Sequence, residues 1–156
     1  MKITIDSREQ APFTFSRFPE VNAERGTLPT GDYSTRGFED LIAVERKSLD
    51  DLIACLMGSN RDRFERELQR GSVMNVFAVV CEGSWEDISR GRYHSQMKPQ
   101  AALQSIIAFM VRYRVPFIMA GSREAAEYIT HGILQKYLRE IEERYKQAMK
   151  AQKGAV

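Results

Sequence analysis

The chain has 156 residues, of which 43% are hydrophobic, and it carries 23 Lys and Arg against 21 Asp and Glu for a net charge of +2. This composition suits one globular domain and excludes the collagen-like, disordered and disulfide-scaffold classes. The near balance of charge also excludes a protein that binds nucleic acid by bulk positive charge, although a local basic surface stays open.

Membrane segments and a leader are not expected. The longest apolar runs, Ile106–Val111 and Val76–Cys81, are far shorter than the ~20 residues of a membrane-spanning helix. The first six residues alternate and turn acidic where a signal peptide would be apolar. Cys55 and Cys81 lie in apolar contexts without metal-ligand spacing, which is typical of reduced core cysteines. We therefore expect a soluble intracellular protein that makes no membrane contact.

The N-terminal part is expected to be mostly extended. The predicted strands are residues 2–6, a short stretch within 21–28, a segment opened by Gly31 and residues 41–47. Residues 10–30 contain three prolines, so most of this stretch is expected to be loop. A turn at 37–40 joins the last two strands into a predicted hairpin.

Helices then alternate with strands. The first two predicted helices are one capped by Ser48 and a polar one capped by Ser59 that ends near Gly71. A strand within 73–81, a helix with Pro99 in its first turn and a strand at 115–119 follow. The last two predicted elements are a helix starting at Ser122 and a separate long helix marked by Leu134 to Tyr145. Such an order predicts an α/β sheet covered by helices on both faces. We expect one domain over residues 1–150 and a frayed tail at 151–156.

Two acidic residues are predicted to meet across the hairpin. If residues 37–40 form a four-residue loop, Arg36 pairs with Leu41, and counting outward pairs Asp32 with Glu45. The Cβ atoms of directly opposed residues lie ~4.5–5.5 Å apart. Two carboxylates at that separation repel each other unless a cation lies between them. A loop one residue longer or shorter would put the pair out of line.

This arrangement suits a hard divalent ion such as Mg²⁺, which takes oxygen ligands and keeps waters for a substrate phosphate. Lys47 projects on the same side of the strand as Glu45, whereas Arg46 takes the other side. A lysine there would orient the attacking water and stabilise charge on the phosphate. The alternative is that Asp32 is a turn residue and that Glu45 and Lys47 are ordinary solvent-exposed strand residues. However, Glu45 follows an apolar strand segment without a break, which favours a functional role.

The same residues resemble a known signature. Gly31-Asp32-Tyr33, followed by the run from Val44 to Leu52, closely resembles the Gly-Asp and Glu-Arg-Lys-x-x-x-Asp motifs of the XPF/Hef family of structure-specific nucleases, and Ile5–Glu9 resembles its Asp-x-Arg-Glu strand end. The resemblance implies a restriction-endonuclease-like PD-(D/E)xK core, with a central mixed sheet flanked by helices. It also implies dependence on Mg²⁺ or Mn²⁺ and cleavage of branched, flapped or forked DNA near single-strand/double-strand junctions.

The family pattern also implies roles for individual residues. Asp32 and Glu45 would bind the metal, and Lys47 would assist the nucleophilic water. The supporting active-site residues would be Asp6, Arg8, Arg46 and Asp51. For two of these residues a structural role is equally expected. Asp51 also fits the helix cap formed with Ser48, and Asp6 fits an Asx turn.

Basic residues outside the motifs are candidate contacts to DNA phosphates. They are Arg61 and Arg63 on the polar helix, and Arg92 and Lys98 in the loop that follows the next strand. A solvated helix would use the same arginines in i,i+4 ion pairs. His94 and His131 are expected at the surface rather than in a site.

One departure from the family is the lack of a helix-hairpin-helix segment after the nuclease motifs. The chain therefore resembles stand-alone nuclease domains of phages and mobile elements, acting in DNA repair or recombination in the bacterial or phage-infected cytoplasm or at the nucleoid. A homodimer or a partner protein would supply substrate targeting. Tyr137, Ile141 and Tyr145 could form a dimer face, although burial against the sheet is the simpler explanation for them. The alternatives are a module that binds junction DNA without cutting it and a resolvase or restriction-type nuclease on the same core.

Overall fold

A computed structural model describes residues 1–154 and contains a six-stranded sheet with strand order β2-β1-β3-β4-β5-β6. The strands are β1 (Lys2–Asp6), β2 (Asn22–Gly26), β3 (Tyr33–Thr35), β4 (Ile42–Lys47), β5 (Val76–Cys81) and β6 (Phe117–Met119). The helices are α1 (Leu49–Ala54), α2 (Gly58–Ser72), α3 (Trp85–Ser89), α4 (Pro99–Tyr113) and α5 (Arg123–Lys153). The predicted strands are thus confirmed, with bounds shifted by a few residues.

The sheet is mixed. β1 runs parallel to β2 and antiparallel to β3, and β3 is antiparallel to β4. β4, β5 and β6 are parallel to one another, because each is joined to the next by helices. The carboxyl ends of β4 and β5 therefore lie together at one edge of the sheet, where α1 and α3 begin.

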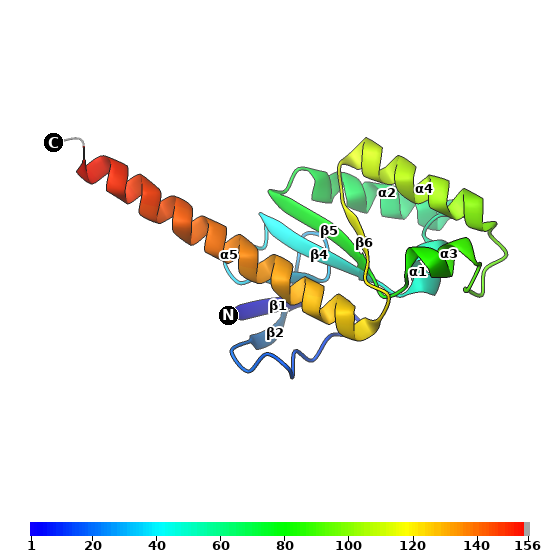
Figure 1. The fold of residues 1–156 in the computed structure, drawn as a ribbon, viewed down its shortest axis with the longest axis horizontal. Coiled ribbons are helices and arrows are strands. Elements are labelled where there is room, and N and C mark those ends of the chain that lie inside the picture. The colour runs from blue at the N-terminus through cyan, green and yellow to red at the C-terminus, as the bar shows by residue number, and fades with distance from the viewer. Residues whose placement is uncertain (155–156) are drawn as a thin grey trace.

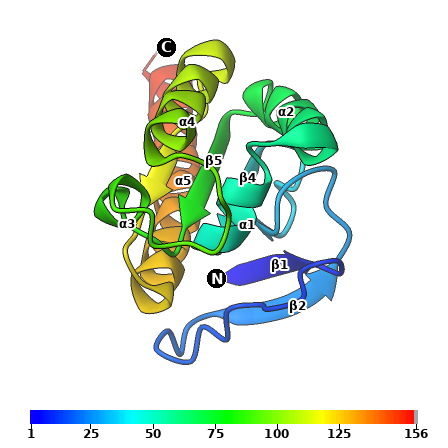
Figure 2. The same ribbon diagram turned by 90° about the vertical axis from the view of Figure 1, so that its right-hand side faces the viewer.

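Side chains of β4 alternate between two separate hydrophobic cores. Ile42 and Val44 belong to the core beneath α5, together with residues of β1 and β3. Ala43 belongs to the core beneath α1, α2 and α4. Figures 1 and 2 show α5 crossing one face of the sheet while α2 and α4 cover the other. The predicted α/β sheet with helices on both faces is confirmed.

The structure confirms two of the helix caps predicted from the sequence and contradicts a third. Ser48 and Ser122 cap α1 and α5 through their side chains, and Pro99 is in the first turn of α4. The predicted cap at Ser59 is wrong. Helix α2 already begins at Gly58, so Ser59 lies inside it, and Met57 at the N-cap position supplies no side-chain hydrogen bond.

The C-terminal region forms one helix, so the prediction of two separate helices is wrong. Buried residues recur at helical spacing through Ala126, Thr130, Leu134 and Tyr137, with no proline to interrupt them. Residues 151–153 of the expected tail continue this helix, and residues 155–156 lie outside the described part.

In Figure 1 the C-terminal half of α5 extends beyond the sheet. Tyr137, in the half of the helix that packs on the sheet, is buried, whereas Tyr145 is 65% exposed. Within residues 1–154, no helix has the length and apolar character needed to cross a bilayer.

Candidate active site

A glycine turn delivers Asp32 to the edge of β4. Gly31 has φ +80°, and a Cβ at this position would lie 2.8 Å from the Cβ of Ala43, so both the backbone conformation and the space require glycine. Two hydrogen bonds then fix the aspartate. Its amide donates to the Val44 carbonyl at 2.9 Å, and the Arg46 amide donates to Asp32 Oδ2 at 2.8 Å.

Asp32, Glu45 and Lys47 share one face of the sheet. Tyr33 pairs with Val44 in the antiparallel ladder, and one step outward on each strand brings Asp32 opposite Glu45. Glu45 and Lys47 are two residues apart on β4 and follow Ala43 on the face covered by α1 and α2. The structure therefore brings together these three residues, at the end of β4 where α1 begins.

Glu45 is the most deeply buried member of this group, with a side chain only 5% exposed. Its Oε1 atom accepts a hydrogen bond from Lys47 Nζ at 2.5 Å. Its Oε2 atom is buried, and no donor among residues 1–154 reaches it. Burial raises the pKa of Glu45, and the nearby charge of Asp32 raises it further.

The pKa of Asp32 is also raised. Burial raises its pKa to about 7, with a further contribution from the Glu9 carboxylate and opposition from the Arg46 amide. Two neighbouring carboxyl groups with raised pKa values are a pair that a cation would stabilise in the charged form. The donor chemistry and the unpartnered Glu45 Oε2 atom thus fit a divalent ion such as Mg²⁺. In the described part of the chain, no three His, Cys, Asp or Glu side chains form a ready-made metal cage.

Lys47 stays charged in this setting. Burial alone would lower the pKa of its ammonium group, but the carboxylates of Glu45 and Glu67 more than reverse this, so the net pKa is raised. The ammonium nitrogen also lies 5.2 Å from the ring centroid of Phe64 on α2. Lys47 is therefore a fixed positive charge and not a proton acceptor at neutral pH.

Glu67 is an acidic residue at this site that the sequence motifs did not identify. It follows Phe64 by three residues on α2, so the two side chains lie on the same helix face. Its charge acts on Glu45, Lys47 and Asp32. No local pattern in the sequence identifies it, because the site forms only when Phe64 of α2 packs against Lys47 of β4.

Asp6 and Arg8 form a tight local unit beside the site. The Asp6 carboxylate accepts hydrogen bonds from the Arg8 amide, from Arg8 Nε and Nη2, and from the Leu28 amide, at 2.7–3.1 Å. Burial would raise the pKa of Asp6, but these bonds lower it overall. The hydrogen bonds from Arg8 to Asp6 hold the Arg8 side chain, which is 70% exposed, in one orientation. Asp6 therefore positions Arg8 and has little capacity left for a metal.

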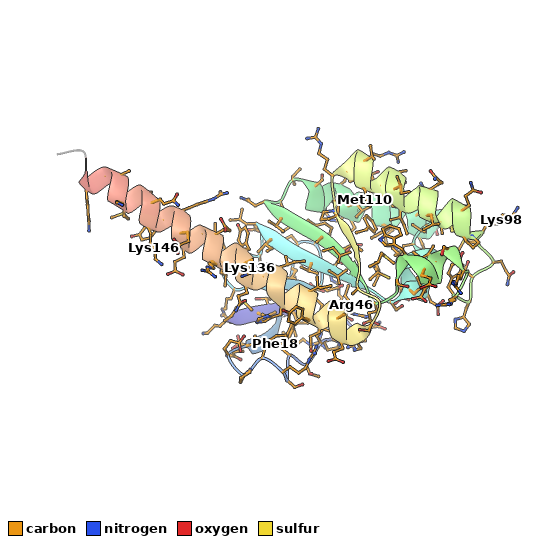
Figure 3. The ribbon with its side chains drawn as sticks, in the orientation of Figure 1. Phe18, Arg46, Lys98, Met110, Lys136 and Lys146 are labelled. Atoms are coloured by element: carbon orange, nitrogen blue, oxygen red, sulfur yellow. The ribbon has the colours of Figure 1, made fainter. Side chains whose placement is uncertain are left out.

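Arg46 points away from the carboxylate pair, as the alternation of β4 predicts. Its guanidinium makes two bonds to Glu9, at 2.8 and 3.0 Å, and one to Glu82 at 2.9 Å. Glu82 also pairs with Arg123 at the start of α5, at 2.7 Å. Figure 3 shows Arg46 inside the body of the molecule. This network, which we call the arginine clamp (Glu9, Arg46, Glu82 and Arg123), joins β4 and the start of α5 to the segments that follow β1 and β5.

Asp51 has its backbone amide bound to Ser48 Oγ at 3.2 Å, and its side chain is exposed on α1. The structure thus supports the capping position for this residue. It does not bring the Asp51 side chain into a hydrogen bond with the carboxylate pair, as far as the described residues show.

The four candidate DNA contacts fall into two groups. Arg61 is engaged inside the protein: its Nη1 atom donates to the Leu56 carbonyl and to Ser105 Oγ, both at 3.1 Å, and its guanidinium lies 4.6 Å from the Phe109 ring centroid. Arg92 is held by Asp87 at 3.1 Å. Arg63 and Lys98 are exposed, and Lys98 lies at the tip of the molecule where α4 begins (Figure 3).

The two histidines differ. His94 is exposed and pairs with Asp50 at 2.6 Å. The expectation of a surface position for His131 is wrong, because its ring stacks on Phe18 with centroids 3.9 Å apart. It is only 6% exposed, and its Nε2 atom lies 2.9 Å from Glu20 Oε1. Cys55 and Cys81 are free thiols, as expected.

Comparisons with known proteins agree with this geometry. A model of the ERCC4 domain matches residues 5–131. The structure of XPF from Aeropyrum pernix resembles the chain with a TM-score of 0.69 at 18% identity, covering 94% of this chain and 70% of that one. XPF from Aeropyrum pernix in complex with DNA gives a TM-score of 0.64 at 18% identity, covering 89% and 66%. No curated protein matches the sequence. The restriction-endonuclease-like fold expected from the motifs is confirmed.

Proposed function

The chain belongs to the ERCC4-domain family of nucleases, and from this membership we propose that it is a divalent-metal-dependent DNA endonuclease acting on branched, flapped or forked DNA. The observation that carries the proposal is the grouping of Asp32, Glu45 and Lys47 on one face, with Glu45 Oε2 buried and lacking a donor among the described residues. A protein that only held DNA would gain nothing from burying an unpaired carboxylate oxygen, which costs stability.

Each residue of the group has a distinct task in this proposal. Asp32 and Glu45 would hold the metal through their carboxylate oxygens. Mg²⁺ or Mn²⁺, when bound, supplies the polarisation of the phosphate and the lowered pKa of a water. Lys47, fixed as an ammonium ion, orients the water and stabilises the negative charge that develops on the phosphate. Asp6 holds Arg8 beside the site, where its exposed guanidinium can contact a neighbouring phosphate.

DNA is the proposed partner on the strength of the family and of the site. The similar XPF from Aeropyrum pernix has been described in complex with DNA. Because the net charge of this chain is only +2, local contacts from Arg63, Lys98 and Arg8 would do more than bulk attraction. A second copy or a partner protein would help to direct the enzyme to junctions. Activity of this kind would take place where DNA is repaired, recombined or replicated, in the bacterial cytoplasm or during phage infection.

Incision assays test the proposal. The pure protein is incubated with end-labelled flapped, forked, four-way and linear DNAs in Mg²⁺, Mn²⁺ or EDTA. We expect incision of the branched DNAs only with metal. Asp32→Asn should abolish incision while DNA binding persists, because asparagine keeps an oxygen for the Arg46 amide. Equal cutting by both proteins, or cutting in EDTA, would contradict the proposal.

A further inference from the structure

Glu67 faces the carboxylate pair from the helix that covers it. Phe64, one turn earlier on α2, has its ring beneath the ammonium group of Lys47, which places this helix face directly over the site. Glu67 is half-buried and lies on the same face. Asp32 thus comes from the turn before β3, Glu45 from β4 and Glu67 from α2.

Only one of the two carboxylate oxygens of Glu45 has a positive partner within the described part of the chain. The Oε1 atom of Glu45 already accepts a hydrogen bond from Lys47 Nζ at 2.5 Å. The buried Oε2 atom has no donor within residues 1–154. Burial raises the pKa of Glu45 most, and the neighbouring carboxylates of Asp32 and Glu67 raise it further. Two carboxylates that face each other without a donor between them need either a shared proton or a cation.

We propose that Glu67 is a third carboxylate ligand of the divalent cation, added from α2 to the pair formed by Asp32 and Glu45. The inference rests on the proposed function and extends it to a residue outside the nuclease motifs. The described residues hold no preformed cage of three acidic ligands, so this role requires the Glu67 side chain to turn towards the ion. A half-buried glutamate on a helix surface can make that adjustment by side-chain rotation, because its backbone need not move.

Direct metal binding tests the inference without relying on activity. Mn²⁺ binding to the DNA-free protein is measured by isothermal titration calorimetry for wild type, Glu67→Gln and Asp62→Asn. Asp62 is an exposed acid on the same helix, so its variant controls for the loss of one negative charge. We expect the Mn²⁺ dissociation constant to rise by about 10-fold or more in Glu67→Gln, the scale of loss when a supporting residue of a metal site is removed. In Asp62→Asn it should stay within a factor of about two, as for other surface changes.

Further variants keep the outcomes distinct. Glu67→Ala should show the same loss and keep the helix, since alanine has the highest helix propensity, and Glu67→Asp should recover part of the affinity. Unchanged Mn²⁺ affinity in Glu67→Gln, together with loss in Asp32→Asn, would overturn the role of Glu67 and leave the nuclease proposal standing. If wild type neither binds Mn²⁺ nor cuts branched DNA, both proposals are wrong.

Discussion

Lys47 Nζ lies 2.5 Å from Glu45 Oε1, and both groups are largely buried at the end of β4. The lysine therefore neutralises one oxygen of the carboxylate and leaves the other for a cation. Its raised pKa keeps it positive at neutral pH.

We expect Lys47→Met to lower the incision rate by roughly 10²–10³-fold, the usual effect of removing one group that stabilises developing charge. Single-turnover incision of a flapped DNA measures the loss, and DNA affinity measured in Ca²⁺ should be unchanged. Lys47→Arg should restore part of the rate. A full rate in Lys47→Met would show that this residue takes no part in the chemistry.

The pKa of Asp32 predicts a specific dependence of stability on pH. Because the folded-state value of about 7 is above the ordinary 3.8, the folded protein binds more protons between these values, and its stability falls as pH rises through this window. Asp32→Asn removes this effect. In EDTA the variant should be more stable than wild type by about 1–3 kcal/mol at pH 8 and equal to it near pH 3.5.

Urea unfolding at the two pH values checks this, and Mg²⁺ should stabilise only the wild type. A variant less stable than wild type at pH 8 would show that the Asp32 carboxylate is not strained by its surroundings.

The arginine clamp is expected to be structural. Arg46→Ala would leave the Glu9 carboxylate buried without its partner, at a cost of about 3–5 kcal/mol in the free energy of unfolding. Arg36→Ala is the matched control, since Arg36 pairs with Glu24 at the surface and should cost under about 1 kcal/mol. Denaturant titration compares the two. If Arg46→Ala were as stable as wild type but inactive, Arg46 would belong to the chemistry.

Two glycines allow backbone strain to be separated from crowding. Gly31 and Gly37 both have positive φ values, of +80° and +88°. A Cβ at Gly31 would meet Ala43, whereas a Cβ at Gly37 meets nothing within 4 Å. Gly37→Ala should therefore cost about 1 kcal/mol and keep incision. Gly31→Ala should cost about 2–4 kcal/mol and lower incision strongly, because the crowding shifts Asp32. Equal effects of the two changes would exclude the crowding argument.

Substitution of Arg61 and substitution of Arg63 should affect different properties of the protein. Arg61 ties α2 to α4 through Ser105 and Phe109, so Arg61→Ala should lower stability by about 1–2 kcal/mol. Arg63 is exposed, and Arg63→Ala should leave stability unchanged, weaken DNA binding and reduce the salt slope of that binding by about 1. Fluorescence anisotropy at several salt concentrations measures the slope. An unchanged slope would remove Arg63 from the DNA interface.

The strand pattern was enough to predict the face on which each residue of β4 lies. Alternation placed Glu45 and Lys47 together and Arg46 opposite, and the hairpin count brought Asp32 to Glu45. Local patterns could not predict Glu67 or the partners of Arg46, because these contacts join elements far apart in the chain. For the same reason Arg61 was indistinguishable from Arg63: both are polar helix residues until α4 packs against one of them.

The arginine clamp has a consequence for strand register. Because the sheet is a single layer, a slip of β4 by one residue would carry Glu45 into the apolar core under α5 and turn Arg46 towards the face covered by α1 and α2. Both salt links of Arg46, to Glu9 and to Glu82, would have to break for such a slip. The clamp thus opposes this slip and holds β4 in the register that keeps Asp32 and Glu45 opposite each other.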